Sequence, residues 1–328
     1  MTSALERVWS RRPASAVAKL AGRPLLFLSA RDLSTAAAQE SALLVAFFAP
    51  APSAMLGFAR AARDANVPLV LVRPSGAADV RGPEEERDDA AFVEAALRAA
   101  LELRFAGPVA LLKEPPRAGS AVPDQERVQR EIDAGFTGVG ITALPDSAAS
   151  ARDAALAAST VCHLELGLEV VPLGGSPEVA AELARALRSR GTTPSMLRLS
   201  GHEESARELA AELGGVCISS TSETRVGELR GLGVQALFAA GPFLRALQRA
   251  VPGELVEKLQ GWADDQSATL EQAAARHQRL LRDLPAAAQE KLEALCCFEA
   301  AELLARAGSL NTSSRLAARV SEMAAQEV

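Results

Sequence analysis

The chain alternates short apolar runs with longer alanine-rich segments of helical period. The runs are rich in valine, isoleucine and leucine and have the length of buried strands. The predicted strands are 42–49, 68–74, 108–113, 138–143, 166–172, 195–200, 215–220 and 234–240. The predicted helices between them are 53–65, 88–104, 124–134, 147–165, 177–190, 203–213 and 222–231. Nearly every junction from helix to strand carries a glycine or proline, which are the residues that end helices.

This alternation predicts a parallel sheet. Helical crossovers of such length connect parallel strands, because hairpins need only short turns. Closing the strands into a (β/α)8 TIM barrel removes both edges of the sheet. The competing arrangement is an open doubly wound sheet, but no glycine-rich fingerprint follows the first strand. We therefore predict an α/β protein with a (β/α)8 barrel over residues 42–252.

Two segments lie outside the predicted barrel. Residues 1–41 form an N-terminal helical extension, with a helix near 3–20 and another over 32–40. Residues 253–328 are helical in pattern throughout. We expect this C-terminal segment to pack on the barrel or to lie at an interface between chains.

Composition and charge narrow the function classes. The 328 residues carry a net charge of -6 and interleave arginine with acidic residues, so they show no basic footprint for nucleic acid. No apolar run reaches the length of a membrane span, and no signal sequence is evident at the basic N-terminus. Four cysteines form neither a CxxC pair nor a disulfide framework. We expect a cytoplasmic protein with free thiols and no membrane partner.

Charged residues stand at the carboxyl ends of the predicted strands, where barrel enzymes place their active sites. The run "GPVALLKEPPRAGS" ends its strand on Lys113 and Glu114, and Glu169 lies on the fifth strand. We take these three as candidate catalytic residues. The alternative for the first two is a solvated ion pair. The alternative for Glu169 is a buried acid paired with Arg198 on the next strand.

A phosphate site is expected where the seventh and eighth strands end, since barrels often bind phosphate there at a helix N-terminus. The segment "SSTSE" supplies the hydroxyls of Ser219, Ser220 and Ser222, and "AAGPF" supplies the backbone of Gly241. Arg198 adds a positive charge nearby. The alternative is an ordinary helix start.

Several segments in the right order resemble class II aldolases. The run "GLEVVPLGG" (167–175) is similar to the fifth-strand segment of the non-catalytic subunit of tagatose-bisphosphate aldolase, and it aligns Glu169 with that family's acid. "REIDAGFTGVGITA" resembles the fourth strand of the superfamily. "SSTSETRVGELRGLGVQALFAAGPFLRALQRAV" and "GSLNTSSRLAARV" resemble later segments of the same subunit. The resemblance extends from about residue 42 to the end.

The departures from this family concern its metal site. Class II aldolases hold a divalent metal with rim histidines, and two of those positions fall on Lys113–Glu114 and Ser219. An ammonium group is no metal ligand, and zinc needs about three protein ligands. For His163, His202 and His277 we expect structural roles, with only His202 near the rim. We therefore predict no bound metal, because the family's divalent metal has been lost, and no other cofactor.

Three functions remain open. The first is a catalytically degenerate class II aldolase-like protein, an accessory or regulatory subunit that binds a sugar phosphate weakly or a partner chain. The second is a metal-independent lyase or isomerase on a phosphorylated sugar, with Lys113 as Schiff-base nucleophile or general acid. The third is a structural or assembly protein. We favour the first.

The C-terminal segment predicts a partner chain. Its apolar residues recur at helical spacing: Leu255, Leu259, Trp262, Leu292, Leu295, Phe298 and Leu303. Packing on the barrel could bury one such stripe. We expect the rest to join the protein to a second copy or, as the resemblance implies, to a catalytic aldolase-type subunit.

Overall fold

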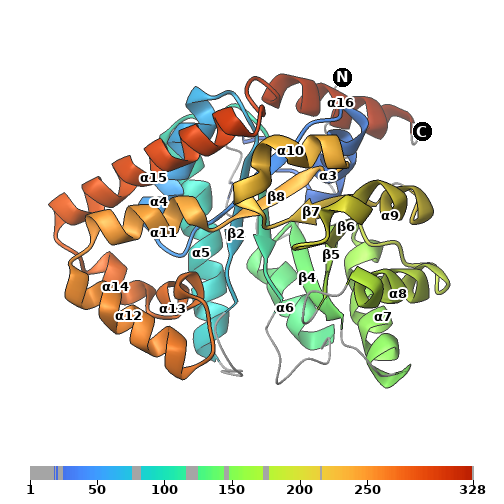
Figure 1. The fold of residues 1–328 in the computed structure, drawn as a ribbon, viewed down its shortest axis with the longest axis horizontal. Helices are drawn as coiled ribbons and strands as arrows, with labels where there is room; N and C mark the ends of the chain where they lie inside the picture. The colour runs from blue at the N-terminus through green and yellow to red at the C-terminus, as the bar shows by residue number, and fades with distance from the viewer. Residues whose placement is uncertain are drawn as a thin grey trace.

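A closed barrel of parallel strands forms the centre of the molecule (Figure 1). The structure is a computed structural model, and it describes residues 18, 20, 25–75, 83–115, 125–143, 148–172, 177–214 and 216–326. The strands are β1 (Leu44–Phe48), β2 (Leu69–Arg73), β3 (Val109–Lys113), β4 (Gly138–Ala143), β5 (Gly167–Pro172), β6 (Met196–Arg198), β7 (Cys217–Ser220) and β8 (Ala236–Ala239). Each pairs with its sequence neighbour, and β8 pairs with β1. The predicted (β/α)8 barrel is confirmed.

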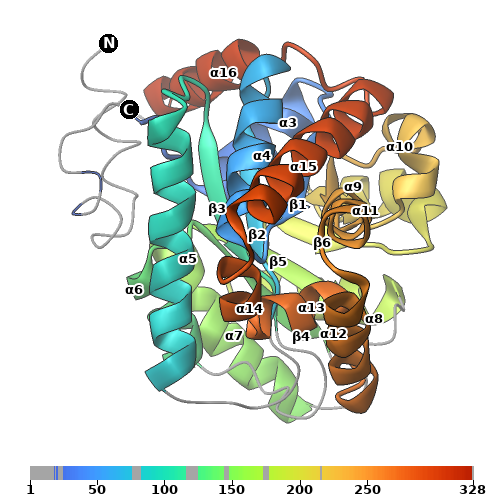
Figure 2. The same cartoon turned by 90° about the vertical axis from the view of Figure 1, so that its left-hand side faces the viewer.

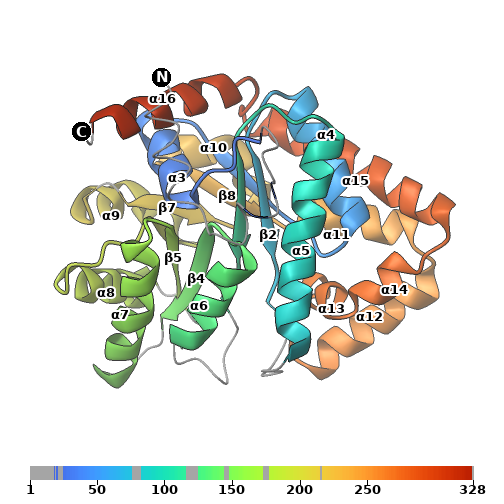
Figure 3. The ribbon, with the colours of Figure 1, turned by 180° about the vertical axis from the view of Figure 1, so that it is seen from behind.

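Helices surround this barrel, and Figure 3 shows α5, α6 and α7 side by side on its outside. The helices between strands are α4 (Pro52–Asp64), α5 (Pro83–Glu102), α6 (Gln125–Ala134), α7 (Ala148–His163), α8 (Pro177–Arg188), α9 (Ala206–Glu212) and α10 (Val226–Leu232). Short 3-10 turns precede the last two: η2 (Glu203–Ser205) and η3 (Glu223–Arg225). Helix α11 (Gly241–Ala250) follows β8.

Alternate residues of each strand face opposite sides of the sheet. On β2 and β3, Val72 and Leu112 belong to an apolar cluster inside the barrel. Their neighbours Leu71 and Leu111 belong to a larger cluster between the sheet and the helices. The same alternation decides which charged residues enter the barrel.

Helix α3 (Ala30–Gln39) closes the amino-terminal end of the barrel. Phe27 forms a parallel bridge to Val109 at the start of β3, and the Ser29 hydroxyl caps the helix. Ala30 sits so close to β5 that a Cβ atom at Gly167 would lie 2.6 Å from its own Cβ. Glycine is therefore required there. The predicted helix near 3–20 falls outside the described residues apart from 18 and 20.

The C-terminal segment is helical, as predicted, and reaches both ends of the barrel (Figure 2). Its helices are α12 (Gly253–Asp265), α13 (Leu270–Arg276), α14 (Gln278–Arg282), α15 (Ala286–Arg306) and α16 (Ser313–Gln326). Helix α15 lies along α4 and α11, and α16 packs on α3. The α4–α15 contact is close, because a Cβ atom at Gly57 would lie 2.9 Å from the Cβ of Cys296.

Packing on the barrel covers most of the C-terminal apolar residues. Leu259, Leu292 and Leu303 are buried, and Leu255, Trp262 and Leu295 are partly buried against the same core. Phe298 alone of this set is exposed, with 52% of its surface accessible. Among the described helices, none combines the length and apolar character needed to cross a bilayer.

Candidate functional site

Four polar side chains, three on strands and one just after a strand, meet inside the barrel near the carboxyl ends of the strands. We call Glu114, Glu169, Arg198 and Ser219 the lumen cluster. Arg198 donates two hydrogen bonds to Glu169, from Nε to Oε1 at 3.1 Å and from Nη2 to Oε2 at 2.7 Å. Its Nη1 donates to Glu114 Oε1 at 3.2 Å, and the Ser219 hydroxyl donates to Glu169 Oε1 at 2.9 Å. The alternative prediction, a buried Glu169–Arg198 pair, is confirmed.

The register of the sheet assembles this cluster. Arg198 of β6 and Ser219 of β7 are paired directly across the two strands, and Glu169 of β5 is paired with Met196 of β6. Because side chains alternate along a strand, Glu169 and Arg198 enter the same lumen. Glu114 follows the last residue of β3 and faces inward as Leu112 does.

Burial sets the electrostatics of the cluster. Burial lowers the pKa of the Arg198 guanidinium, but the charges and hydrogen bonds of Glu169 and Glu114 outweigh it, so the net shift is upward. The guanidinium also lies 4.3 Å from the centroid of the Phe238 ring. Burial also raises the pKa of the Cys217 thiol, and the charge of Glu169 adds to that shift. Arg198 stays charged and Cys217 stays a thiol near neutral pH.

A residue from the C-terminal helices completes the cluster. Gln272 of α13 is 1% exposed, and its Nε2 lies 3.5 Å from Glu114 Oε2. Its Oε1 accepts from the Thr269 backbone N–H, while the Thr269 hydroxyl accepts from the Gln272 N–H, which forms a capping box. The sequence shows the Thr-x-x-Gln pattern of this helix start, but nothing local predicts the contact with Glu114.

Lys113 faces away from the lumen. Its Nζ lies 2.7 Å from Asp89 Oδ1 of α5, and Arg73 of β2 reaches the same oxygen at 2.7 Å. All three side chains are buried between the sheet and the helices. The structure thus separates Lys113 from Glu114, although the sequence predicts both on the rim. The sequence does not single out Asp89 as the partner of Lys113, because several other acidic residues stand beside it at the start of α5.

The predicted phosphate hydroxyls are engaged by a carboxylate of the chain itself. Ser220 and Ser222 donate from Oγ to Glu203 Oε1 at 2.6 Å and 2.5 Å, and the Gly201 N–H donates to the same atom at 3.1 Å. Burial raises the pKa of Glu203, but these hydrogen bonds lower that pKa by a larger amount, so the net shift is downward. Glu203 therefore holds an anion's place in this loop.

A second carboxylate occupies the start of α11. Glu223 Oε1 accepts from the Gly241 N–H at 2.6 Å, and Arg245 Nη1 lies 3.6 Å from Glu223 Oε2. This is the helix N-terminus at which the sequence predicts a phosphate. The four predicted phosphate donors are thus divided among three glutamates: Ser219 donates to Glu169, Ser220 and Ser222 donate to Glu203, and Gly241 donates to Glu223. Phosphate binding there stays a prediction.

The residues present do not fit a divalent metal. Within the described ranges, no group of three His, Cys, Asp or Glu side chains could hold one. Arg198 forms ion pairs with both lumen carboxylates, and its guanidinium cannot be a ligand. His163 and His202 are exposed, and the His277 ring stacks on Trp262 with centroids 3.6 Å apart. None of the three joins the lumen cluster.

Solved structures of similar architecture include three aldolases. The YdjI aldolase from Escherichia coli K12 superposes with a TM-score of 0.62 at 14% identity, covering 88% of this chain and 99% of that one. A putative fructose-1,6-biphosphate aldolase from Coccidioides immitis gives 0.59 at 13%, over 87% and 98%. Fructose-bisphosphate aldolase from Campylobacter jejuni gives 0.56 at 11%, over 89% and 98%.

The shared feature is the fold. The architecture is shared over nearly the whole of each aldolase chain. At identities this low, the likeness says nothing about the roles of individual residues. No family model matches the sequence, and no curated protein matches it significantly.

Proposed function

We propose that the protein is a catalytically degenerate, class II aldolase-like barrel that serves as an accessory or regulatory protein. One observation carries the proposal: the Arg198 guanidinium joins Glu114 and Glu169 in the lumen. The resemblance puts two of the family's metal-binding positions on Lys113–Glu114 and on Ser219. Here Glu114 and Ser219 belong to a buried, hydrogen-bonded network with Glu169 and Arg198, and Lys113 pairs with Asp89.

The network resists metal-assisted chemistry. A divalent ion would have to displace Arg198 from two carboxylates, and a buried guanidinium without a partner costs several kcal/mol, on the order of 3–5. Gln272 adds a donor to the free oxygen of Glu114. The carboxylates then have little capacity left to act as a base.

The second hypothesis, a metal-independent lyase, gains no support from the position of Lys113. A Schiff-base lysine needs access to substrate and a lowered pKa. Lys113 is 2% exposed, and Asp89 holds its ammonium group on the helix side of the sheet. We do not propose it.

The sugar-phosphate ligand is retained as weak binding. Its phosphate would have to replace Glu203 at Ser220 and Ser222, or Glu223 at Gly241. Each replacement exposes a carboxylate that is now hydrogen-bonded. Such competition weakens binding and fits a regulatory role better than turnover.

The partner is proposed to be a second copy of the chain, meeting through α15. Phe298 is exposed on this helix, and so are Lys291 and Glu302. The three residues share one face of the helix, because Lys291 stands seven residues before Phe298 and Glu302 stands four after it. An antiparallel pair of α15 helices would bring Lys291 of one copy beside Glu302 of the other. Light scattering is expected to give a dimer, and Phe298→Ser a monomer. A monomeric wild type would overturn self-association, and a complex with an aldolase chain would replace it.

The proposed function is tested on the full-length chain. Purified protein is expected to leave tagatose and fructose bisphosphates uncleaved beside an active class II aldolase, and to contain no stoichiometric metal by elemental analysis. One metal per chain that is lost in Glu114→Gln or Glu169→Gln would overturn the proposal. A borohydride-trapped adduct of dihydroxyacetone phosphate on Lys113 would instead establish the lyase.

A further inference from the structure

A buried carboxylate stands on an otherwise exposed loop. Glu203 lies in the loop after β6 and is 0% exposed, whereas its neighbours His202 and Glu204 are exposed. A glutamate is seldom buried completely unless partners compensate for the water that it loses. The partners of Glu203 therefore indicate what this loop is built to hold.

Three hydrogen-bond donors converge on a single oxygen of Glu203. The hydroxyls of Ser220 and Ser222 and the N–H of Gly201 all donate to Oε1, at 2.6, 2.5 and 3.1 Å. The other oxygen, Oε2, is also buried, but it accepts no hydrogen bond from the described residues, and Arg225 Nη1 lies 3.6 Å from it. Donors and a guanidinium thus surround an oxyanion that uses them only in part.

The donors belong to a segment that is held in place. Ser220 ends β7, and the backbone N–H of Ser222 donates to its hydroxyl at 2.9 Å. The next residue, Glu223, is fixed from two sides. Its Oε1 accepts from the Gly241 N–H at 2.6 Å, and its backbone oxygen accepts from Arg306 Nη2 at 3.1 Å. The two hydroxyls therefore keep their positions without help from Glu203.

Glu203 itself is on a short turn that follows a glycine. The 3-10 turn η2 spans only Glu203–Ser205. Gly201 before it has a φ of 81°, and a Cβ atom there would meet nothing within 4 Å. The left-handed conformation favours glycine, and the open space allows the backbone to rotate there without a clash. The carboxylate can thus leave its donors while they stay in place.

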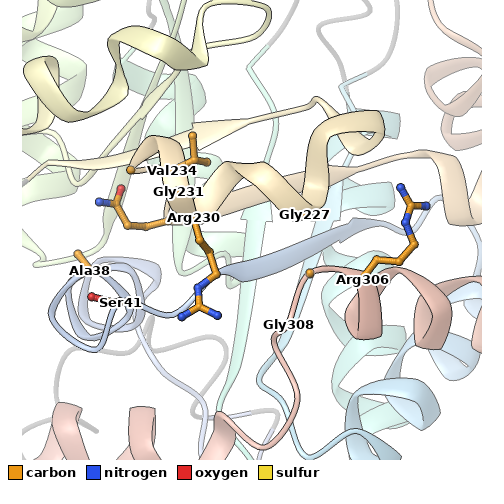
Figure 4. A pocket seen from close by; sticks show the side chains of 11 residues that line it. Ala38, Ser41, Gly227, Arg230, Gly231, Val234, Arg306 and Gly308 are labelled. Atoms are coloured by element: carbon orange, nitrogen blue, oxygen red, sulfur yellow. The ribbon is translucent and has the colours of Figure 1, made fainter.

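The opposite end of the barrel offers no comparable set of donors. In the pocket drawn in Figure 4, the guanidinium groups of Arg230 and Arg306 point apart. The C-terminal ends of α10 and α15 lie beside this pocket, and their partial negative charge disfavours an anion. A ligand with negative charge is therefore expected at the carboxyl end of the strands, where Glu203 lies.

We propose that Glu203 is an internal competitor for a phosphate group, and that a phosphorylated metabolite binds by displacing it from Ser220 and Ser222. A phosphate group carries several acceptor oxygens, so it can accept from both hydroxyls and also pair with Arg225, which lies beside Oε2. The displaced carboxylate turns toward solvent with the loop at Gly201. This inference rests on the proposed function, because it states how the weak phosphate site of that proposal is regulated.

Calorimetric titration of the full-length chain with inorganic phosphate, at constant ionic strength, compares wild type with Glu203→Ala. The apparent Kd rises as the fraction of molecules with an open site falls, so a site open in about one molecule in ten binds about tenfold more weakly. Glu203→Ala is therefore expected to bind phosphate at least about tenfold more tightly than wild type. Adding Ser222→Ala to that variant should weaken binding about tenfold again, because it removes a charge-assisted hydrogen bond.

Thermal melting provides a second measurement, since Glu203→Ala also loses stability. Phosphate is expected to raise the melting temperature of this variant more than acetate does at the same ionic strength, because acetate offers only two oxygens and one charge. Gly167→Ala is the matched control. It is destabilised by a clash at the other end of the barrel, and it reports the general effect of phosphate on stability.

The source of the phosphate group is tested with dihydroxyacetone phosphate, which should bind to Glu203→Ala at least as tightly as inorganic phosphate. An ester that is excluded where free phosphate binds would overturn the metabolite as ligand. The inference also fails if Glu203→Ala binds phosphate no more tightly than wild type, if acetate stabilises it as much as phosphate, or if phosphate stabilises Gly167→Ala equally. The proposed loss of metal and of cleavage is measured separately, by elemental analysis and the aldolase assay, so either idea can fail alone.

Discussion

Replacing Arg198 by methionine is expected to destabilise the barrel strongly. Arg198 is 5% exposed, and it holds Glu169 and Glu114, which are 2% and 7% exposed. Methionine fills much of the same volume but removes three charge-assisted hydrogen bonds. Two buried carboxylates would then lie close together without a counter-charge.

The size of the loss follows from that burial. Breaking a buried ion pair by removing one partner costs about 3–5 kcal/mol, mostly because the remaining charge stays desolvated. The contact with the Phe238 ring adds to the loss. A domain is stable by only about 5–15 kcal/mol, so Arg198→Met should remove a large part of the total.

Urea unfolding followed by far-ultraviolet circular dichroism measures this effect. The triple variant Glu114→Gln/Glu169→Gln/Arg198→Met is expected to recover most of the loss, since a neutral replacement of a buried ion network is often nearly neutral in energy. Arg279→Met, an exposed arginine on α14, serves as control and should change stability by less than about 0.5 kcal/mol.

Two results would refute the reasoning. A loss below about 1 kcal/mol in Arg198→Met would mean that water reaches the carboxylates and screens them. A triple variant no more stable than Arg198→Met would mean that the packing of the arginine side chain, and not its charge, stabilises the lumen.

Three further predictions concern other parts of the fold. Glu203→Gln is expected to cost about 1–3 kcal/mol in urea unfolding, because the hydroxyl of Ser220 then donates to a neutral group; an unchanged midpoint would contradict this. Burial, with the charges of Arg276 and Lys258 nearby, holds the pKa of His277 below 6.5. The unfolded chain therefore binds more protons, and stability should fall as pH drops below about 6.5. His277→Gln should flatten that slope, and an equal slope would exclude His277 as its source. Gly167→Ala should cost about 1–3 kcal/mol by clashing with α3, and a gain in melting temperature would show that α3 can move away.

The fold could be predicted because its signal is repeated. Eight apolar runs of strand length, separated by helical segments that end on glycine or proline, leave few alternatives to a parallel barrel. The Glu169–Arg198 pair could also be anticipated, since both lie on consecutive strands whose parallel pairing places them together.

The site was harder because its partners are remote in sequence. Gln272 lies in the C-terminal segment, for which the sequence pattern predicts helices but not their contacts. No local feature connects Gln272 with Glu114. Lys113 and Glu114 were expected together on the rim, but neighbours along a strand face opposite sides, so only one of them enters the lumen. Which of the two enters the lumen depends on the register with β2 and on Asp89.

The contact between α4 and α15 has a consequence for synthesis of the chain. Helix α4 follows the first strand, whereas α15 is made near the end of synthesis. The face of α4 that carries Gly57 packs against α15, closely enough that a Cβ atom there would clash with it. At about 10 residues per second the surface of α4 waits on the order of tens of seconds for its cover. Ribosome-bound chains that stop before α15 should therefore expose apolar surface and depend on chaperones. A chain cut off before α12 should aggregate more than the full chain does.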